Sequence, residues 1–233
     1  MSYVGIRETR FAGGVNDRDV ADIFNQLREP DGSQYIRDFD DFVNYLVTDW
    51  STGGVGAGTT AVQAGLGGLL RLTNTAADND NRWIQRNNPN FQLTAGKKLF
   101  FSCRMAQFSE ATQIDVAVGL QIAVAANNFL TPVNGLFFRK DDGDTIIHLV
   151  NRAAGVETVV DLATNFAAAT AYRLQFFYDG GTDIWAAVNG VTLGRMTPAA
   201  LPNVLMGPTI GIQDGDAVAR NADIDQIFVL QER

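Results

Sequence analysis

The chain has 233 residues, of which 46% are hydrophobic and 19% are charged, and its formal net charge is −8. This composition excludes an intrinsically disordered chain, and the acidic balance is unfavourable for non-specific binding to nucleic acid. No run of about 18 apolar residues is present and MSYVGIRETR at the start lacks an apolar stretch, so we expect neither a membrane-spanning helix nor a secretory signal.

The first predicted element is a short amphipathic helix over residues 16–28, preceded by an extended arm over residues 3–14. Asn16 or Asp17 can cap the helix, because a side-chain oxygen there accepts hydrogen bonds from the free amides of the first turn. Apolar residues then recur at i, i+3, i+4 and i+7, which is one helix face: Val20, Ile23, Phe24 and Leu27.

Residues 38–49 leave two interpretations open. Phe39, Phe42, Val43 and Leu46 have helical spacing. Tyr45, Val47 and Trp50 would lie off that stripe. A strand or an irregular segment is therefore the alternative to a helix.

From residue 51 onward the pattern is that of short strands separated by turns. Residues 53–58 carry four glycines and predict a flexible loop. Residues 76–90 predict a polar loop, within which residues 82–85 can form a short strand. Asp-Asp-Gly-Asp at 141–144, Asp-Gly-Gly at 179–181 and Asn-Gly at 189–190 predict turns that need positive φ angles. The predicted strands cover residues 59–62, 68–73, 82–85, 97–107, 115–124, 135–139, 145–152, 157–162, 171–178, 184–188, 209–213 and 222–231.

These elements predict a mainly β fold, a two-sheet antiparallel jelly-roll sandwich behind an N-terminal arm and helix. The predicted boundary divides the chain into an arm and helix, residues 1–34, and a sandwich domain, residues 35–233.

The order of strands and turns resembles the concanavalin-A-like lectin/glucanase sandwich. The resemblance is carried by GLFFRKDDGD at 135–144, LQFFYDG at 174–180, IWAAVNG at 184–190, and GIQ at 211–213 with IDQI at 224–227. It covers residues 97–233, and more loosely the chain from residue 51.

The whole chain also resembles virion proteins of tailed bacteriophages, which place this sandwich behind a short arm. A run such as RDFDDF at 37–42 leading to a Trp such as Trp50 is part of that resemblance. It implies a capsid decoration (cement) protein, made in the host cytoplasm and bound to the outer surface of the head. The implied partners are the major capsid protein and further copies of this chain in a homo-oligomer, with no direct contact to nucleic acid or membrane.

The arm and the helix are the predicted contact segments of such a protein, which would bridge neighbouring capsid subunits. Arginines in the arm suit acidic partner surfaces, because a guanidinium matches a carboxylate. The helix face has an alternative use, since it can pack on the sandwich of its own chain. The predicted partner-binding residues are Tyr3, Ile6, Arg7, Arg10 and Phe11 in the arm and Ile23, Phe24 and Leu27 in the helix.

Glycoside hydrolysis by a retaining mechanism needs two carboxyl groups about 5–5.5 Å apart. Asp115 stands alone on its predicted strand, and the pair Asp223 and Asp225 has no third acid in register. The five glutamates, Glu8, Glu29, Glu110, Glu157 and Glu232, include no pair at the required spacing. We therefore predict no catalytic residues and a protein that is not an enzyme.

Metal and cofactor sites are also not predicted. Cys103, the only cysteine, alternates with apolar residues and predicts an inert core thiol. His148, the only histidine, has no nucleophile identified beside it. The acidic turns at 78–81 and 141–144 could offer oxygen ligands to Ca²⁺, but turn formation explains the same residues.

The alternative function is a carbohydrate-binding or adhesin module of a virion fibre. In that case Trp83 or Trp185 would be the aromatic on which a sugar stacks. A glycoside hydrolase is the third and disfavoured hypothesis.

Overall fold

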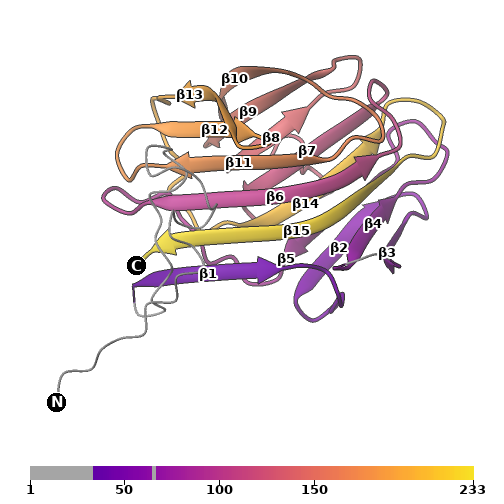
Figure 1. Cartoon of the computed structure of the whole chain (residues 1–233), viewed down its shortest axis with the longest axis horizontal. Coiled ribbons are helices and arrows are strands. Elements are labelled where there is room, and N and C mark those ends of the chain that lie inside the picture. The colour runs from indigo at the N-terminus through magenta and orange to yellow at the C-terminus, as the bar shows by residue number, and fades with distance from the viewer. Residues whose placement is uncertain (1–33, 65–66) are drawn as a thin grey trace.

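The computed structural model describes residues 34–64 and 67–233, which form two antiparallel β-sheets packed face to face (Figure 1). In sheet A the order is β13 (Val191–Met196), β12 (Ile184–Val188), β11 (Tyr172–Tyr178), β6 (Leu99–Phe108), β15 (Asn221–Glu232), β4 (Leu69–Thr73) and β3 (Thr59–Gln63), and β1 (Tyr35–Asp40) also pairs with β15. In sheet B the order is β10 (Val156–Asn165), β9 (Ile146–Ala153), β8 (Gly135–Lys140), β7 (Ile114–Gln121), β14 (Gly207–Asp214), β5 (Asn81–Arg86) and β2 (Trp50–Val55). The predicted mainly β two-sheet sandwich is confirmed, and the described ranges contain no helix.

Strand alternation builds the core between the sheets. On β6 the inward residues are Leu99, Phe101, Cys103 and Met105, each fully buried. Phe101 stacks on Phe176 of β11 with ring centroids 4.7 Å apart, and Phe138 of sheet B approaches the same Phe176 ring at 5.9 Å. These aromatic contacts join the two sheets at the centre of the sandwich.

The predicted inert core thiol at Cys103 is confirmed as buried. Burial raises its pKa strongly, and the nearby Asp225 carboxylate adds to that shift. The thiol therefore stays protonated and unreactive in the folded protein.

The predicted turns are present. Gly143 lies at φ 75°, Gly180 at 81°, and the pair Asn189 and Gly190 at 52° and 76°. Positive φ at both central residues of the last turn matches the twist of a two-residue hairpin, which joins β12 to β13.

The predicted helix over residues 16–28 and the arm lie outside the described residues. Between residues 38 and 49 the structure has the end of β1 followed by turns, so the non-helical alternative is confirmed. Phe42 is fully buried there with its ring 5.5 Å from that of Trp50, and the Trp50 Nε1 donates a hydrogen bond of 2.8 Å to Asp40 Oδ2. The backbone forms one turn here, in which the Asp49 and Trp50 amides donate to Leu46 O at 3.0 and 3.2 Å, and it does not continue into a helix.

The strands β2 and β13 were not predicted, and β1 was predicted only where it overlaps residues 38–49, as one of two alternatives. Gly53 and Gly54 lie inside β2, not in a loop. They pair with β5, and a Cβ at Gly53 would clash with the Trp83 indole, while a Cβ at Gly54 would clash with Asn81 O. The strand β13 was missed because much of it is exposed, with Val191 at 58%, and so it lacks a buried apolar alternation.

A buried polar cluster fastens the loop after β4 to the end of β14. Asn74 Nδ2 donates to Asp80 O at 3.1 Å and to Asp214 Oδ1 at 2.9 Å, and the Asp214 amide donates to Asp80 O at 2.8 Å. The Asp214 side chain is fully buried. Its burial, together with the Asp80 and Asp216 carboxylates, raises its pKa from 3.8 to about 6, against the opposing effects of the Asn74 hydrogen bond and Arg220.

Asp214→Asn is expected to remove a pH dependence of stability. Because the folded-state pKa of Asp214 is raised, its contribution is fully present below about pH 4 and is lost as the pH rises to about 6. The free energy of unfolding, measured by urea titration from pH 4 to pH 7, should therefore fall less steeply for the variant than for the original chain. Parallel curves for the two proteins would contradict the raised pKa.

Candidate functional site

The outer face of sheet B gathers polar side chains around an apolar centre. On β7 the residues Val116, Val118 and Leu120 point into the core, so the residues between them point outward. Two of these outward residues are small, Ala117 and Gly119, which leaves room at the middle of the face.

Phe129 fills that room. It comes from the loop between β7 and β8, and its side chain is fully buried among Ala117, Phe137 and Val150. A Cβ on Gly211 of β14 would lie 2.4 Å from the ring, so glycine is required at that position. The centre of the face is therefore a closed apolar surface formed by these residues, which we call the apolar floor.

Trp83 of β5 lies beside this centre. Its indole lies over Gly53 of β2 so closely that a Cβ there would be 2.3 Å from Cζ2. Its Nε1 donates a hydrogen bond of 2.9 Å to Asn127 Oδ1, from the loop that carries Phe129. Trp83 is only partly buried, so part of the residue remains exposed.

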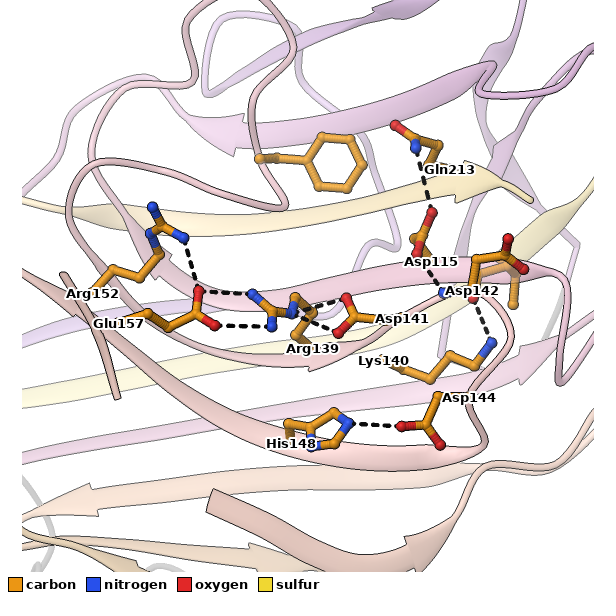
Figure 2. A network of polar contacts seen from close by, with 12 residues as sticks. Asp115, Arg139, Lys140, Asp141, Asp142, Asp144, His148, Arg152, Glu157 and Gln213 are labelled. Atoms are coloured by element: carbon orange, nitrogen blue, oxygen red, sulfur yellow. Dashed lines mark hydrogen bonds and ion pairs between the residues drawn. The ribbon is translucent and has the colours of Figure 1, made fainter. Parts of the chain in front are cut away.

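One end of the face carries a cluster of carboxylate and amide groups. Gln213 Nε2 lies 3.3 Å from Asp115 Oδ2, and the Asp142 amide donates to Asp115 Oδ1 at 2.6 Å (Figure 2). Gln213 Nε2 is also 3.3 Å from Asn79 Oδ1. Burial raises the pKa of Asp115, and the neighbouring Asp141 and Asp142 carboxylates add to that rise, against the hydrogen bond from the Asp142 amide.

Lys140 does not face this cluster. It is 2% exposed, and its Nζ donates to the backbone oxygens of Thr112 at 2.5 Å and Ile114 at 2.7 Å. Burial lowers the pKa of Lys140, while the surrounding carboxylates act in the opposite direction. Lys140 thus braces the start of β7, which carries Asp115.

The other end of the face carries the Glu157 carboxylate, which is bound by two arginines. Arg139 donates to both Glu157 oxygens at 2.9 and 3.0 Å, and Arg152 donates to Glu157 Oε2 at 2.8 Å (Figure 2). Burial alone would raise the pKa of Glu157, but the two guanidinium groups outweigh it and hold that pKa below its usual range. Glu157 is therefore ionised near neutral pH and engaged by both arginines.

His148 also lies on this face, as the alternation of β9 predicts. Its Nδ1 is 2.7 Å from Asp161 Oδ1, and its Nε2 is 3.1 Å from Asp144 Oδ2. Both ring nitrogens thus face carboxylates, and these two contacts fix the orientation of the imidazole.

The carboxyl groups of this face have different surroundings. A glycosidase needs a protonated acid as well as a second carboxylate at the right distance. Glu157 is held ionised by Arg139 and Arg152, and Asp115 is the one carboxyl on the described part of this face with a raised pKa. Asp223 and Asp225 lie in sheet A, where each is bound to an arginine, Arg71 and Arg104 respectively.

Within residues 34–64 and 67–233, no group of three or more His, Cys, Asp and Glu side chains is arranged to hold a metal. The acidic turn at 141–144 uses its last carboxylate locally, since Asp144 Oδ1 accepts from the Thr145 and Ile146 amides at 2.6 and 2.9 Å. No helix in the described part of the chain is long and apolar enough to cross a membrane.

The eight predicted partner-binding residues, from Tyr3 to Leu27, lie outside the described residues. The structure places the two candidate stacking residues on opposite outer faces, Trp83 on sheet B and Trp185 on sheet A.

The arginine-bound Glu157 and the central Phe129 were not predicted. Ala154 and Gly155 both have positive φ, at 51° and 83°, and form the hairpin turn that places Arg152 opposite Glu157. A glycine turn signal between two strands could have indicated that pair. No sequence signal marks Phe129, because it lies in a loop without periodicity.

Comparison with solved structures shows the same sandwich in proteins of very different sequence. An endo-1,3-beta-glucanase from Streptomyces sioyaensis is 15% identical with a TM-score of 0.62, over 87% of this chain and 98% of that one. The carbohydrate recognition domain of Emp47p is 13% identical with a TM-score of 0.60, over 86% and 98%. A carbohydrate esterase from the Shiga toxin-encoding bacteriophage phi24B is 16% identical with a TM-score of 0.52, over 79% and 90%.

No family model and no curated protein matches the chain. At these identities the likeness to solved structures shows the fold, and the predicted resemblance to the concanavalin-A-like jelly-roll sandwich is confirmed. That fold occurs in a glucanase and in a carbohydrate recognition domain. The capsid decoration role stays a prediction.

Glu157→Gln is expected to destabilise the protein by about 1–3 kcal/mol, because charged hydrogen bonds are lost and two arginines are left facing each other. Since the pKa of Glu157 is lowered, its contribution is present above the usual Glu range and is lost as the pH falls through the folded-state pKa. Urea unfolding at pH 7 measures the change.

Asp183→Asn is the matched control for this prediction. Its partner Arg195 is 53% exposed and the pair is screened by solvent, so removing the charge should destabilise the protein much less than Glu157→Gln does. An equal loss of unfolding free energy in the two variants would contradict a larger stabilisation by Glu157 and its two arginines.

Proposed function

We propose that this protein is a carbohydrate-binding module that holds a glycan on the outer face of sheet B beside Trp83. The observation that carries the proposal is the Trp83 indole, which lies over Gly53 and is held by Asn127 on a face rich in fixed polar groups. A partly exposed aromatic ring that is fixed in orientation stacks on the apolar face of a sugar at low entropic cost.

The polar groups around the ring can form hydrogen bonds with the hydroxyl groups of a sugar. Sugar hydroxyls both donate and accept, so they need carboxylate and amide partners whose positions are fixed. Asp115, Gln213 and Asn79 supply such groups at one end of the face, and their mutual hydrogen bonds hold them in place. The similar structures include a carbohydrate recognition domain, which supports the same function for this chain.

The proposed module is not catalytic. Glu157 is fully engaged by two arginines, so it is available neither as a proton donor nor as a nucleophile. The capsid decoration role, the capsid and self-association partners, and the virion location stay predictions, since no observation favours them over glycan binding.

Trp83→Ala is expected to weaken glycan binding by roughly tenfold or more, because the stacking surface is lost. The measurement is a glycan array with the full chain, followed by calorimetric titration of the best-bound glycan. Trp185→Ala is the matched control, since it removes the same side chain from the opposite face and should leave the affinity unchanged. Equal losses in both variants, or an array without reproducible binding, would overturn the proposal.

Incubation with a β-1,3-glucan is expected to release no more reducing ends with the original chain than with Asp115→Asn. Asp115 is the acid on this face whose pKa is raised, so any hydrolysis there would depend on its carboxyl. Release of reducing ends that disappears in Asp115→Asn would show that the face is catalytic.

A further inference from the structure

A second apolar cluster lies on the outer face of sheet A, which is the nearer layer in Figure 1. Its residues alternate along their strands with core residues, so their side chains point away from the sandwich interior. Its members are Phe100, Phe177, Ala187 and Leu230, with the partly buried Tyr35, Trp185 and Phe228 packed against them.

This face is buried although it belongs to the outside of a two-layer sandwich. Phe177 is 1% exposed, and Ala187 and Leu230 are fully buried. Gln175, on the same face, is 1% exposed and its Nε2 has no hydrogen-bond partner among the described residues. The described apolar side chains that pack on the cluster all come from strands of sheet A itself, so its burial calls for a cover from outside that sheet.

The chain before residue 34 enters the structure at the edge of this face. Tyr35 is the first residue of β1, pairs with Glu232 at the end of β15, and packs against the cluster. The preceding 33 residues could span about 100 Å when extended. From β1 to β12 the face is five strands wide, or about 20 Å. The preceding chain is therefore long enough to cross the face.

The charges of the face and of the preceding chain are complementary. Arg104 and Arg173 lie directly opposite each other on β6 and β11 and line a groove of about 360 Å³. Arg104 is paired with Asp225, and no ion pair of Arg173 occurs among the described residues. Residues 1–33 contain six acidic side chains against four arginines, a balance of −2, and five of the six acidic side chains lie in residues 16–31.

We propose that residues 1–33 of the same chain cover the outer face of sheet A. In this arrangement Ile23, Phe24 and Leu27 supply the apolar contact, and acidic side chains of residues 16–31 lie toward Arg173 and Arg104. The segment that the sequence predicts as a contact for other subunits is then engaged within its own chain, and it is available to a partner only after release from sheet A.

The test measures access to the covered face in the full chain. Ser102→Cys introduces a nearly isosteric thiol on this face, at a position 6% exposed, and the native Cys103 is buried and unreactive. Val191→Cys, at a position 58% exposed, gives the rate for an open thiol. The reaction with Ellman's reagent should be much slower for Ser102→Cys than for Val191→Cys.

Adding Ile23→Asp, Phe24→Asp and Leu27→Asp to Ser102→Cys is expected to raise its labelling rate by at least about tenfold, because the apolar contact is replaced by charge. Asn25→Asp is the control, since it adds charge to the same segment off the apolar stripe and should leave the rate unchanged. Ala187→Cys replaces Ser102→Cys as the reporter if the latter fails to fold by its thermal transition.

Three results would overturn the proposal. A Ser102→Cys rate equal to that of Val191→Cys would show that the face is open. A rate unaffected by the three Asp substitutions would show that this segment is not the cover. Protection that is lost on dilution but insensitive to those substitutions would assign the cover to a second copy. None of these results depends on glycan binding, so the two proposals fail separately.

Discussion

The two-residue period of the β-strand is the constraint on which the rest of this structure depends. Each apolar residue that points between the sheets places its neighbour on an outer face, and the core requires such residues on every central strand. The core therefore determines which positions of the chain form the two outer faces, while their chemistry remains free to vary. Sheet A uses them for a second apolar cluster, and sheet B uses them for a polar network around an apolar floor.

On sheet B, residues without side chains decide where the large rings lie. Gly211 makes room for the Phe129 ring, and Gly53 makes room for the Trp83 indole. Any other residue at these two positions would put a Cβ within 2.4 Å of ring carbon. The form of the candidate site thus depends on complementary volumes as much as on its polar groups.

The elements that the sequence predicts well are those with a strong local signal. The alternation around Cys103 predicts β6, and Asn189-Gly190 predicts its hairpin, because both depend on neighbours in the chain. Gly53 was assigned to a loop because its partner, Trp83, lies 30 residues further on, and strand pairing alone reveals the fit. The ion pairs of Glu157 likewise depend on Arg139, which the β8–β9 hairpin brings close. The pattern of a single strand therefore does not show them.

The pairing of β1 with β15 has a mechanical consequence. The two strands are antiparallel, and the Arg233 amide donates to Gln34 O at 2.8 Å, so the two ends of the described sandwich leave it at the same point. A load applied through Gln34 and Arg233 would open this strand pair like a zipper, one hydrogen-bonded rung at a time, instead of shearing all rungs together. Such a joint yields at low force, and its failure strips β1 from the sheet while leaving β6 paired with β15.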